Sequence, residues 1–256
     1  MTGQLPLALE LREGHALENF HAGPNRAAWA TVSAAGDGDE RQVFVWSAAG
    51  QGRSHLLEGA VRRAPAQGRD ACLLPAAELL PLVPDVRESM EQFQLLAVDD
   101  VDLFAGHREW EEALFHLYNR VMALGGTLLF SAGASPGGVP WGLPDLATRL
   151  AAGPVFRLQP LEEDDLVTLL IERANERGLK LGGDVARFMV LRSERAPAAL
   201  IQRLATLDRV ALARPPAPPA PSDPDVVGGW RRPRPPGPSC GACGAGPPRP
   251  TRRPPC

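Results

Sequence analysis

Lysine and cysteine are scarce in this chain, and long apolar runs are absent. Of the four cysteines only Cys72 lies in the first 213 residues, so no disulfide framework holds the fold. Lys180 is the one lysine, and every other basic residue is arginine. No run of about 18 apolar residues occurs, and the first twenty residues lack a basic segment followed by an apolar one. We therefore expect a cytoplasmic protein with no membrane anchor.

A net positive charge is found only in the C-terminal segment 214–256. That segment carries seven arginines against two aspartates, a charge of about +5, which leaves about −8 for the remainder of a chain whose overall charge is −3. Strong direct DNA binding depends on clustered basic side chains that neutralise phosphates. The charge distribution therefore predicts that any contact with DNA is indirect.

Proline dominates the same segment, with fifteen in residues 214–256. Proline lacks a backbone N–H, and the segment has too little apolar surface to form a core, so we predict that it is disordered. Two origins remain open. One is a lineage-specific extension, and the other is a change of reading frame in GC-rich coding DNA, whose codons favour proline, arginine, glycine and alanine.

Residues 20–213 alternate short apolar runs with longer helical patterns, which is typical of β-α units and a parallel sheet. We expect strands at 42–46, 71–79, 93–102, 126–133 and 154–161. Helices are expected at 53–65 and 109–124, and then at 162–177, 183–193 and 197–213. The pattern predicts an α/β nucleotide-binding domain (20–160) with a parallel sheet flanked by helices, followed by a small helical lid (161–213).

The stretch SAAGQGRS (47–54) lies between the first expected strand and its helix, where a phosphate-binding loop belongs. In the usual G-x-x-x-x-G-K-[ST] pattern, backbone N–H groups and a helix N-terminus face the phosphates while a cation and a hydroxyl assist. Here Ser47 replaces the first glycine and Arg53 replaces the lysine, with a wider planar fork. Gly50 and Gly52 keep the backbone freedom of the loop, and Ser54 keeps the hydroxyl.

Two acidic residues, Asp99 and Asp100, end the expected strand at 93–102. This order places one carboxylate near a magnesium ion and a second near an attacking water. The alternative is a solvated strand end, which the preceding loop of this type disfavours.

Four blocks of the chain carry a resemblance to a known family. They are GQGRSHLLEGA (50–60), LLAVDDVDLFAGHREWEEALFHLYNRV (95–121), LFSAGASPGGVPWGLPDLATRLAAGPVFRLQPL (129–161) and TLDRVA (206–211). Together they resemble the AAA+ domain of the replication initiator DnaA, and more closely the DnaA-related regulatory inactivators of the Hda type. The resemblance covers about 1–213. It implies an AAA+ P-loop fold that binds ADP or ATP, with Mg²⁺, through Gly50, Gln51, Gly52, Arg53, Ser54 and His55.

The N-terminal arm (1–19) contains QLPLAL (4–9), which resembles the short peptide by which such proteins bind the DNA polymerase sliding clamp (its β subunit). An extended segment presents Leu5, Leu7 and Leu9 to a hydrophobic pocket while Gln4 hydrogen-bonds at the rim. The plainer alternative is a short apolar N-terminal strand.

Arg149, in LPDLATRLAAG (143–153), corresponds by resemblance to the arginine finger that an AAA+ protomer projects into its neighbour's nucleotide. The alternative is a surface arginine paired with Asp145 on the same turn. The resemblance favours the finger, and it leaves open whether the chain forms a homo-oligomer.

Two residues depart from the family pattern inside the expected nucleotide site. Gly133 stands at the end of the fourth strand, where an acidic residue is common, and Ala198 stands where the lid offers an arginine. Arg195, about one turn earlier, is a candidate substitute that Pro197 restricts. These departures predict weak or no intrinsic ATPase activity.

The resemblance therefore implies a negative regulator of chromosomal replication initiation. ADP-bound protein would dock on the DNA-loaded clamp, reaching DNA and the nucleoid only through partners, and Arg149 would promote ATP hydrolysis by DnaA. Two alternatives remain: an adaptor that recruits DnaA or other partners without promoting hydrolysis, and an independent ATPase.

Overall fold

A five-stranded parallel sheet forms the centre of the α/β domain, with strand order β2-β3-β4-β1-β5. This computed structural model describes residues 14–82, 90 and 92–213. The strands are β1 (Gln42–Trp46), β2 (Ala71–Pro75), β3 (Leu95–Asp99), β4 (Thr127–Ala132) and β5 (Val155–Arg157). Because β4 lies between β1 and β3, the loops that follow these three strands meet at one edge of the sheet.

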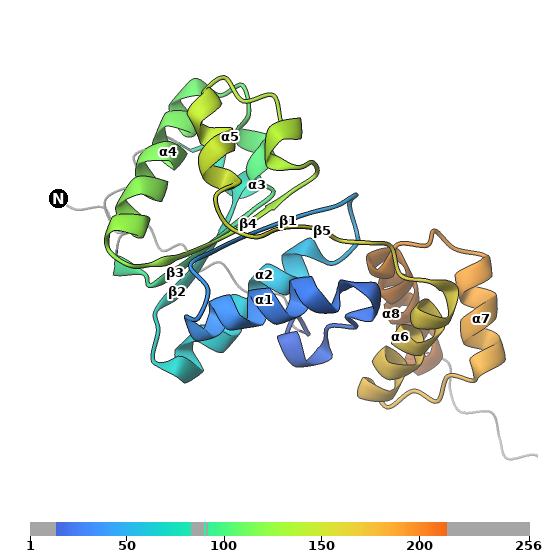
Figure 1. Ribbon diagram of the computed structural model, residues 1–256. Helices are drawn as coiled ribbons and strands as arrows, with labels where there is room; N and C mark the ends of the chain where they lie inside the picture. The colour runs from blue at the N-terminus through green and yellow to red at the C-terminus, as the bar shows by residue number, and fades with distance from the viewer. Residues whose placement is uncertain (1–13, 83–89, 91, 214–256) are drawn as a thin grey trace, which may run out of the picture. The chain divides into compact units, whose positions relative to one another are not determined.

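Helices cover both faces of the sheet (Figure 1). They are α1 (Arg26–Asp37), α2 (Arg53–Arg63), α3 (Ala76–Leu79), α4 (Arg108–Ala123) and α5 (Pro144–Leu150). Helices α3, α4 and α5 pack on the face that carries Phe44 and Phe130, and α1 and α2 pack on the face that carries Val45 and Leu129. A sheet buried on both faces has strands with apolar runs, which is why β1, β3 and β4 contain the runs VFVW, LLAV and LLF.

Three helices form the lid around a core of their own: α6 (Glu163–Glu176), α7 (Gly183–Leu191) and α8 (Pro197–Ala213). Leu166, Leu170 and Leu200 are fully buried there. The first turn of α6 is acidic, with Glu163, Asp164 and Asp165, which suits the positive end of a helix dipole. The predicted fold class, a parallel sheet flanked by helices and followed by a helical lid, is therefore confirmed. The proposed domain limits at 19, 160 and 213 stay predictions.

Several element predictions need correction. The strand expected at 71–79 ends at Pro75, and Ala76–Leu79 forms the short helix α3. Pro75 is tolerated because β2 is an edge strand paired on one side only. The strand expected at 154–161 shortens to Val155–Arg157, and α1 and α5 were not predicted.

Two sequence predictions lie outside the described residues: the clamp peptide with Gln4, Leu5, Leu7 and Leu9, and the disordered segment 214–256. Among the residues that are described, no helix combines the length and the apolar character needed to cross a membrane.

Candidate functional site

The loop between β1 and α2 has the backbone geometry of an anion-binding turn. Gly50 and Gly52 adopt positive φ angles of 79° and 98°, a region that favours glycine. Helix α2 begins at Arg53, and the Leu56 N–H donates to the Gly52 carbonyl at 3.1 Å. The N–H groups of the turn before Leu56 have no partner inside the helix, so they and the helix dipole are suited to hold a phosphate.

The Arg53 guanidinium lies between this loop and the acidic end of β3. Its Nη2 is 2.8 Å from Asp100 Oδ1, and its side chain is only 12% exposed. Its Nη1 is buried and has no hydrogen-bond partner within the described residues. The structure thus pairs Arg53 with Asp100, a contact that the sequence did not predict, and leaves one guanidinium nitrogen able to bind a further acceptor.

Ser131, the residue before the last of β4, holds the two acidic residues in place. Its hydroxyl donates to the buried Asp99 Oδ1 and accepts from the Asp100 backbone N–H at 2.8 Å. Asp100 has φ 52°, an unusual value for a residue with a side chain. Such backbone strain concentrates at functional sites. No group of three or more His, Cys, Asp or Glu side chains placed to hold a metal occurs in the described part of the chain.

The lid reaches the loop through the start of α8. The Ala198 N–H donates to the Gly50 carbonyl at 3.3 Å, and a Cβ on Gly50 would lie 3.1 Å from the Ala196 Cβ. The methyl group of Ala198 offers no cation to a phosphate. Arg195, the candidate substitute, is 65% exposed, and its Nη2 is 3.7 Å from Glu163 Oε2.

A narrow pocket of about 40 Å³ adjoins the loop, with walls from the N-terminal segment, from α2 and from the lid. Its lining residues are Phe20, His21, Asn25, Gln51, Gly52, His55, Leu161, Leu169, Arg173, Pro197 and Ile201. This volume holds only a few water-sized molecules.

His55 lies on the wall of this pocket as a half-buried, neutral imidazole. Its Nε2 is 2.9 Å from both the Ala16 carbonyl and Asn19 Oδ1, so Nε2 carries the hydrogen. Burial lowers the pKa of His55 from 6.5 to about 4, with a smaller raising effect from the Ala16 hydrogen bond. The ring stacks on His15, with 4.6 Å between centroids.

We expect His55 to make the fold sensitive to acid. Because the pKa of His55 is lower in the folded state, the unfolded chain takes up this proton first as the pH falls. The contribution to stability is complete above pH 6.5 and is lost between pH 6.5 and about 4, at a cost of about 3 kcal/mol. Urea unfolding at several pH values measures it. The His55→Gln variant should lose less stability over that range, and an identical pH slope in both proteins would contradict the assignment.

Arg149 lies on α5, on the face of the sheet opposite α2 and the loop. Its guanidinium carbon is 4.6 Å from the Phe115 ring centroid and 5.6 Å from that of Tyr118, both on α4. Among the described residues no ion pair joins Arg149 to Asp145. The prediction that Arg149 acts on a neighbouring protein stays open.

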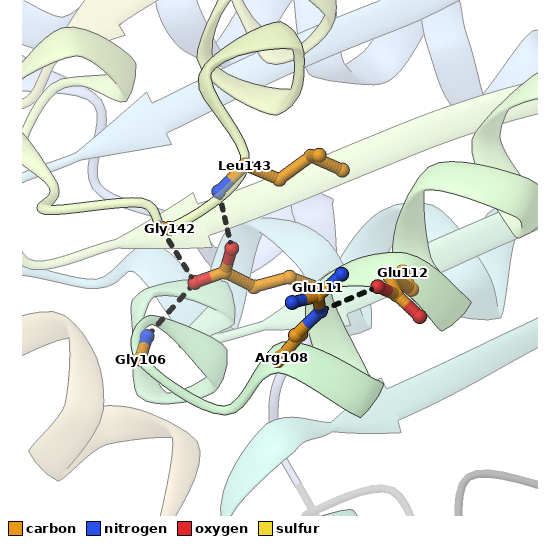
Figure 2. Close-up of a pocket in the computed structure, with 6 residues that line it drawn as sticks. All are labelled: Gly106, Arg108, Glu111, Glu112, Gly142 and Leu143. Carbon is orange, nitrogen blue, oxygen red and sulfur yellow. Dashed lines mark hydrogen bonds and ion pairs between the residues drawn. The ribbon is translucent and has the colours of Figure 1, made fainter.

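Both ends of α5 are held by buried polar side chains. At the start of the helix the Glu111 carboxylate accepts the N–H groups of Gly106 (2.8 Å), Gly142 (3.0 Å) and Leu143 (2.7 Å), as Figure 2 shows. At its end the Gln42 amide donates to the carbonyls of Arg149 (2.9 Å) and Leu150 (3.0 Å). These contacts fix the position of the helix that carries Arg149.

Sequence reasoning missed Glu111 and Asp102. Glu111 is 1% exposed, although it stands in the first turn of a helix, where a carboxylate is usually solvated. Asp102 follows Asp99 and Asp100 in the same acidic run, and its Oδ2 accepts the Gly133 N–H at 3.0 Å. The acidic run DDVD (99–102) includes Asp102, but its hydrogen-bond partner, Gly133, lies just after β4 and far away in the sequence.

Comparison with solved structures gives the same fold. Domain III of the replication initiation protein DnaA from Thermotoga maritima superposes with a TM-score of 0.71 and 19% identity, over 80% of this chain and 92% of that one. AMPPCP-bound DnaA from Aquifex aeolicus gives 0.68 and 19%, over 80% and 68%. A replication initiator DnaA bound to AMPPCP and single-stranded DNA gives 0.68 and 21%, over 78% of this chain. That match covers 66% of the DnaA chain, just under two thirds of its length.

The lid matches a family model of its own. Residues 163–215 match the lid domain of Hda, and they comprise the three helices α6, α7 and α8. This match falls directly after a sheet domain with the fold of the DnaA structures. Residues 163–215 therefore match the Hda lid domain, and the chain shares the fold of the solved DnaA structures.

Proposed function

We propose that this chain is a negative regulator of chromosomal replication initiation that acts on DnaA. The Hda lid-domain match, on a chain with the DnaA fold, is the observation that carries the proposal. In this function the protein docks on the DNA-loaded sliding clamp through its N-terminal peptide. Arg149 then enters the interface with ATP-bound DnaA and promotes hydrolysis of that ATP.

The loop at 47–54 would hold an adenine nucleotide, ADP or ATP with Mg²⁺, that stabilises the protein in the form competent to bind DnaA. The first-turn N–H groups of α2 and the unpartnered Arg53 Nη1 fit a phosphate chain. AMPPCP in two of the matching DnaA structures supports an adenine nucleotide as the ligand. Weak or absent intrinsic hydrolysis is favoured by Arg53 in place of lysine, by Gly133 and by Ala198. The nucleotide bound at the loop would therefore stabilise a conformation of the protein and would rarely be hydrolysed there.

Arg149 would supply positive charge to the ATP of DnaA during hydrolysis. A cation at the γ-phosphate stabilises the charge that develops in transfer, which is worth about 10³–10⁵ in rate for other nucleoside triphosphatases. Its position supports this role, because α5 lies across the sheet from the loop of the same chain. Release of the guanidinium from the Phe115 and Tyr118 rings costs about 1 kcal/mol, which an interface can offset.

The decisive experiment mixes this protein with ATP-loaded DnaA, the sliding clamp and DNA, and follows conversion of bound ATP to ADP. We expect faster conversion only when all components are present. If the protein binds DnaA but leaves the ATP lifetime unchanged, it is an adaptor and the proposed activity is wrong. Substantial ATP turnover by the protein alone would instead make it an independent ATPase.

Replacing Leu5 and Leu7 by alanine should abolish binding to the clamp. Each substitution removes a large apolar side chain that would fill the clamp's pocket. Binding of the protein to surface-immobilised clamp measures the loss of affinity, which we expect to exceed about 100-fold. Leu11→Ala, just past the peptide, is the matched control and should bind normally. Unchanged binding by the double variant would show that the clamp contact lies elsewhere.

A further inference from the structure

The end of α5, which carries Arg149, is held by the Gln42 side chain from the start of β1. Gln42 Nε2 donates to the carbonyls of Arg149 at 2.9 Å and of Leu150 at 3.0 Å. The last carbonyls of a helix have no partner inside the helix, and α5 has only seven residues, so an unsupported last turn would fray. Gln42 therefore fixes the main chain of the residue whose side chain is proposed to act on DnaA.

The turn after α5 packs against the same glutamine. A Cβ on Gly153 would lie 2.6 Å from the Gln42 carbonyl oxygen and 2.9 Å from the Gln42 Cβ. Both distances are too short for a side chain, so glycine is what permits this close approach. The chain that leaves α5 thus lies directly against Gln42, which adds packing to the two hydrogen bonds.

Tyr118 on α4 holds the Gln42 side chain in turn. Its hydroxyl donates to Gln42 Oε1 at 2.7 Å, and Tyr118 and Gln42 are only 5% and 3% exposed. Burial raises the pKa of the Tyr118 hydroxyl, which therefore stays protonated and able to donate at neutral pH. A buried network in which the amide oxygen and the amide nitrogen both have partners is rigid.

The ring of Tyr118 also lies beside the side chain of Arg149. The Arg149 guanidinium carbon is 5.6 Å from the Tyr118 ring centroid and 4.6 Å from that of Phe115, and Arg149 and Phe115 are both half-buried. Buried hydrogen bonds thus fix the main chain of Arg149, whereas its guanidinium rests on rings that it can leave at small cost. This division suits a side chain that starts from one fixed point and enters another protein.

We propose that Gln42 and Tyr118 are positioning residues for Arg149, which fix the end of α5 so that the guanidinium enters the DnaA interface from one place. This inference rests on the proposal that Arg149 promotes hydrolysis of DnaA-bound ATP. A displacement of about 1 Å at a reacting group can lower a rate by about 100-fold. Gln42 and Tyr118 affect the stimulated rate only through the position of Arg149.

Two variants loosen this network without removing Arg149. Gln42→Met keeps the length of the side chain but cannot donate to the α5 carbonyls, and Tyr118→Phe keeps the ring but loses the hydroxyl. Stimulation is measured as conversion of DnaA-bound ATP to ADP, with clamp and DNA present, over a range of concentrations of this protein. The titration separates the maximal stimulated rate from the concentration that gives half of it.

We expect the maximal rate to fall about tenfold in Gln42→Met and about threefold in Tyr118→Phe, in which the amide still reaches α5. The half-maximal concentration should stay within about twofold of the wild-type value, because the substituted side chains are buried and the binding surface is kept. The double variant should be no slower than Gln42→Met alone, since residues of one hydrogen-bond network do not act additively.

Thr127→Val is the matched control. Thr127 is buried at the start of β4, and its hydroxyl accepts from Arg69 Nη2 at 2.7 Å. It lies two residues before Leu129, on the face of the sheet opposite α5. Valine has nearly the same shape but loses this hydrogen bond. The variant should therefore melt at a lower temperature, as Gln42→Met and Tyr118→Phe should, yet keep the wild-type maximal rate.

Three outcomes would overturn the inference. Wild-type maximal rates in both Gln42→Met and Tyr118→Phe would show that the network does not position Arg149, although the regulatory function stands. An equal loss of rate in Thr127→Val would tie the effect to stability alone. An absence of stimulation by the wild type, or full stimulation by Arg149→Ala, would refute the proposed role of Arg149 and the positioning inference with it.

Discussion

Replacing Arg149 by alanine should abolish the stimulation of DnaA-bound ATP hydrolysis while leaving the protein folded. The guanidinium is the group that the proposal places in the DnaA interface, and arginine fingers of other nucleoside triphosphatases contribute about 10³–10⁵ in rate. We expect the stimulated rate to fall by at least about 100-fold. Stability should change by only about 1 kcal/mol, because the variant loses the contacts with the Phe115 and Tyr118 rings.

Two control variants make this result specific. Arg192→Ala removes a guanidinium 5.5 Å from the Phe188 ring on the lid, and it should leave stimulation intact. Arg149→Lys keeps the charge but loses the planar fork, and it should recover only a small part of the activity. Clamp binding should match the wild type in all three variants. Full stimulation by Arg149→Ala would remove Arg149 from the mechanism.

Replacing Glu111 by alanine should lower the free energy of unfolding by about 2–4 kcal/mol. The side chain is 1% exposed and accepts three backbone N–H groups, from Gly106, Gly142 and Leu143. Alanine leaves all three donors unpaired. A neighbouring hollow of about 250 Å³ lets water reach them, which limits the loss. Urea unfolding at neutral pH measures the change.

The residue next to Glu111 supplies the control. Glu112 makes an exposed ion pair with Arg108, with 2.8 Å between Oε1 and Nε, and Glu112→Ala should cost about 0.5 kcal/mol or less. The loss of unfolding free energy in Glu111→Gln should lie between those of Glu111→Ala and Glu112→Ala. The amide oxygen of glutamine still accepts a hydrogen bond, but its NH₂ group faces a backbone donor. Since Glu111 fixes the start of α5, its loss should also weaken stimulation by Arg149. Equal costs for Glu111→Ala and Glu112→Ala would show that the three hydrogen bonds contribute nothing.

Local patterns were sufficient for the strands that lie inside the sheet. β1, β3 and β4 each contain a run of three or four consecutive apolar residues, because parallel strands covered on both faces are buried on both sides. At the two edges the same reasoning failed. The apolar residues after Pro75 form helix α3 rather than more strand. β5 has only three residues, because edge strands in native sheets are often short.

The candidate site was predictable in part for the same reason. Gly50, Gly52 and Arg53 adjoin one another in sequence, and the acidic end of β3 follows from strand order, so their shared location could be predicted. The ion pair between Arg53 and Asp100 was not predicted. The contact of Arg149 with Phe115 and Tyr118 could not, because it joins two helices through packing that no local pattern encodes.

By itself the sequence determined the parallel α/β fold, the helical lid and the place of the phosphate-type loop, because each depends on periodicity and turn residues within a short window. Only the tertiary structure decided which polar groups became partners. It buried Glu111 against two loops, set Asp102 over Gly133 beside Arg53, and placed Ala198 against Gly50. Those contacts join segments far apart in the chain, and burial, which removes water as the competing partner, is what makes them strong.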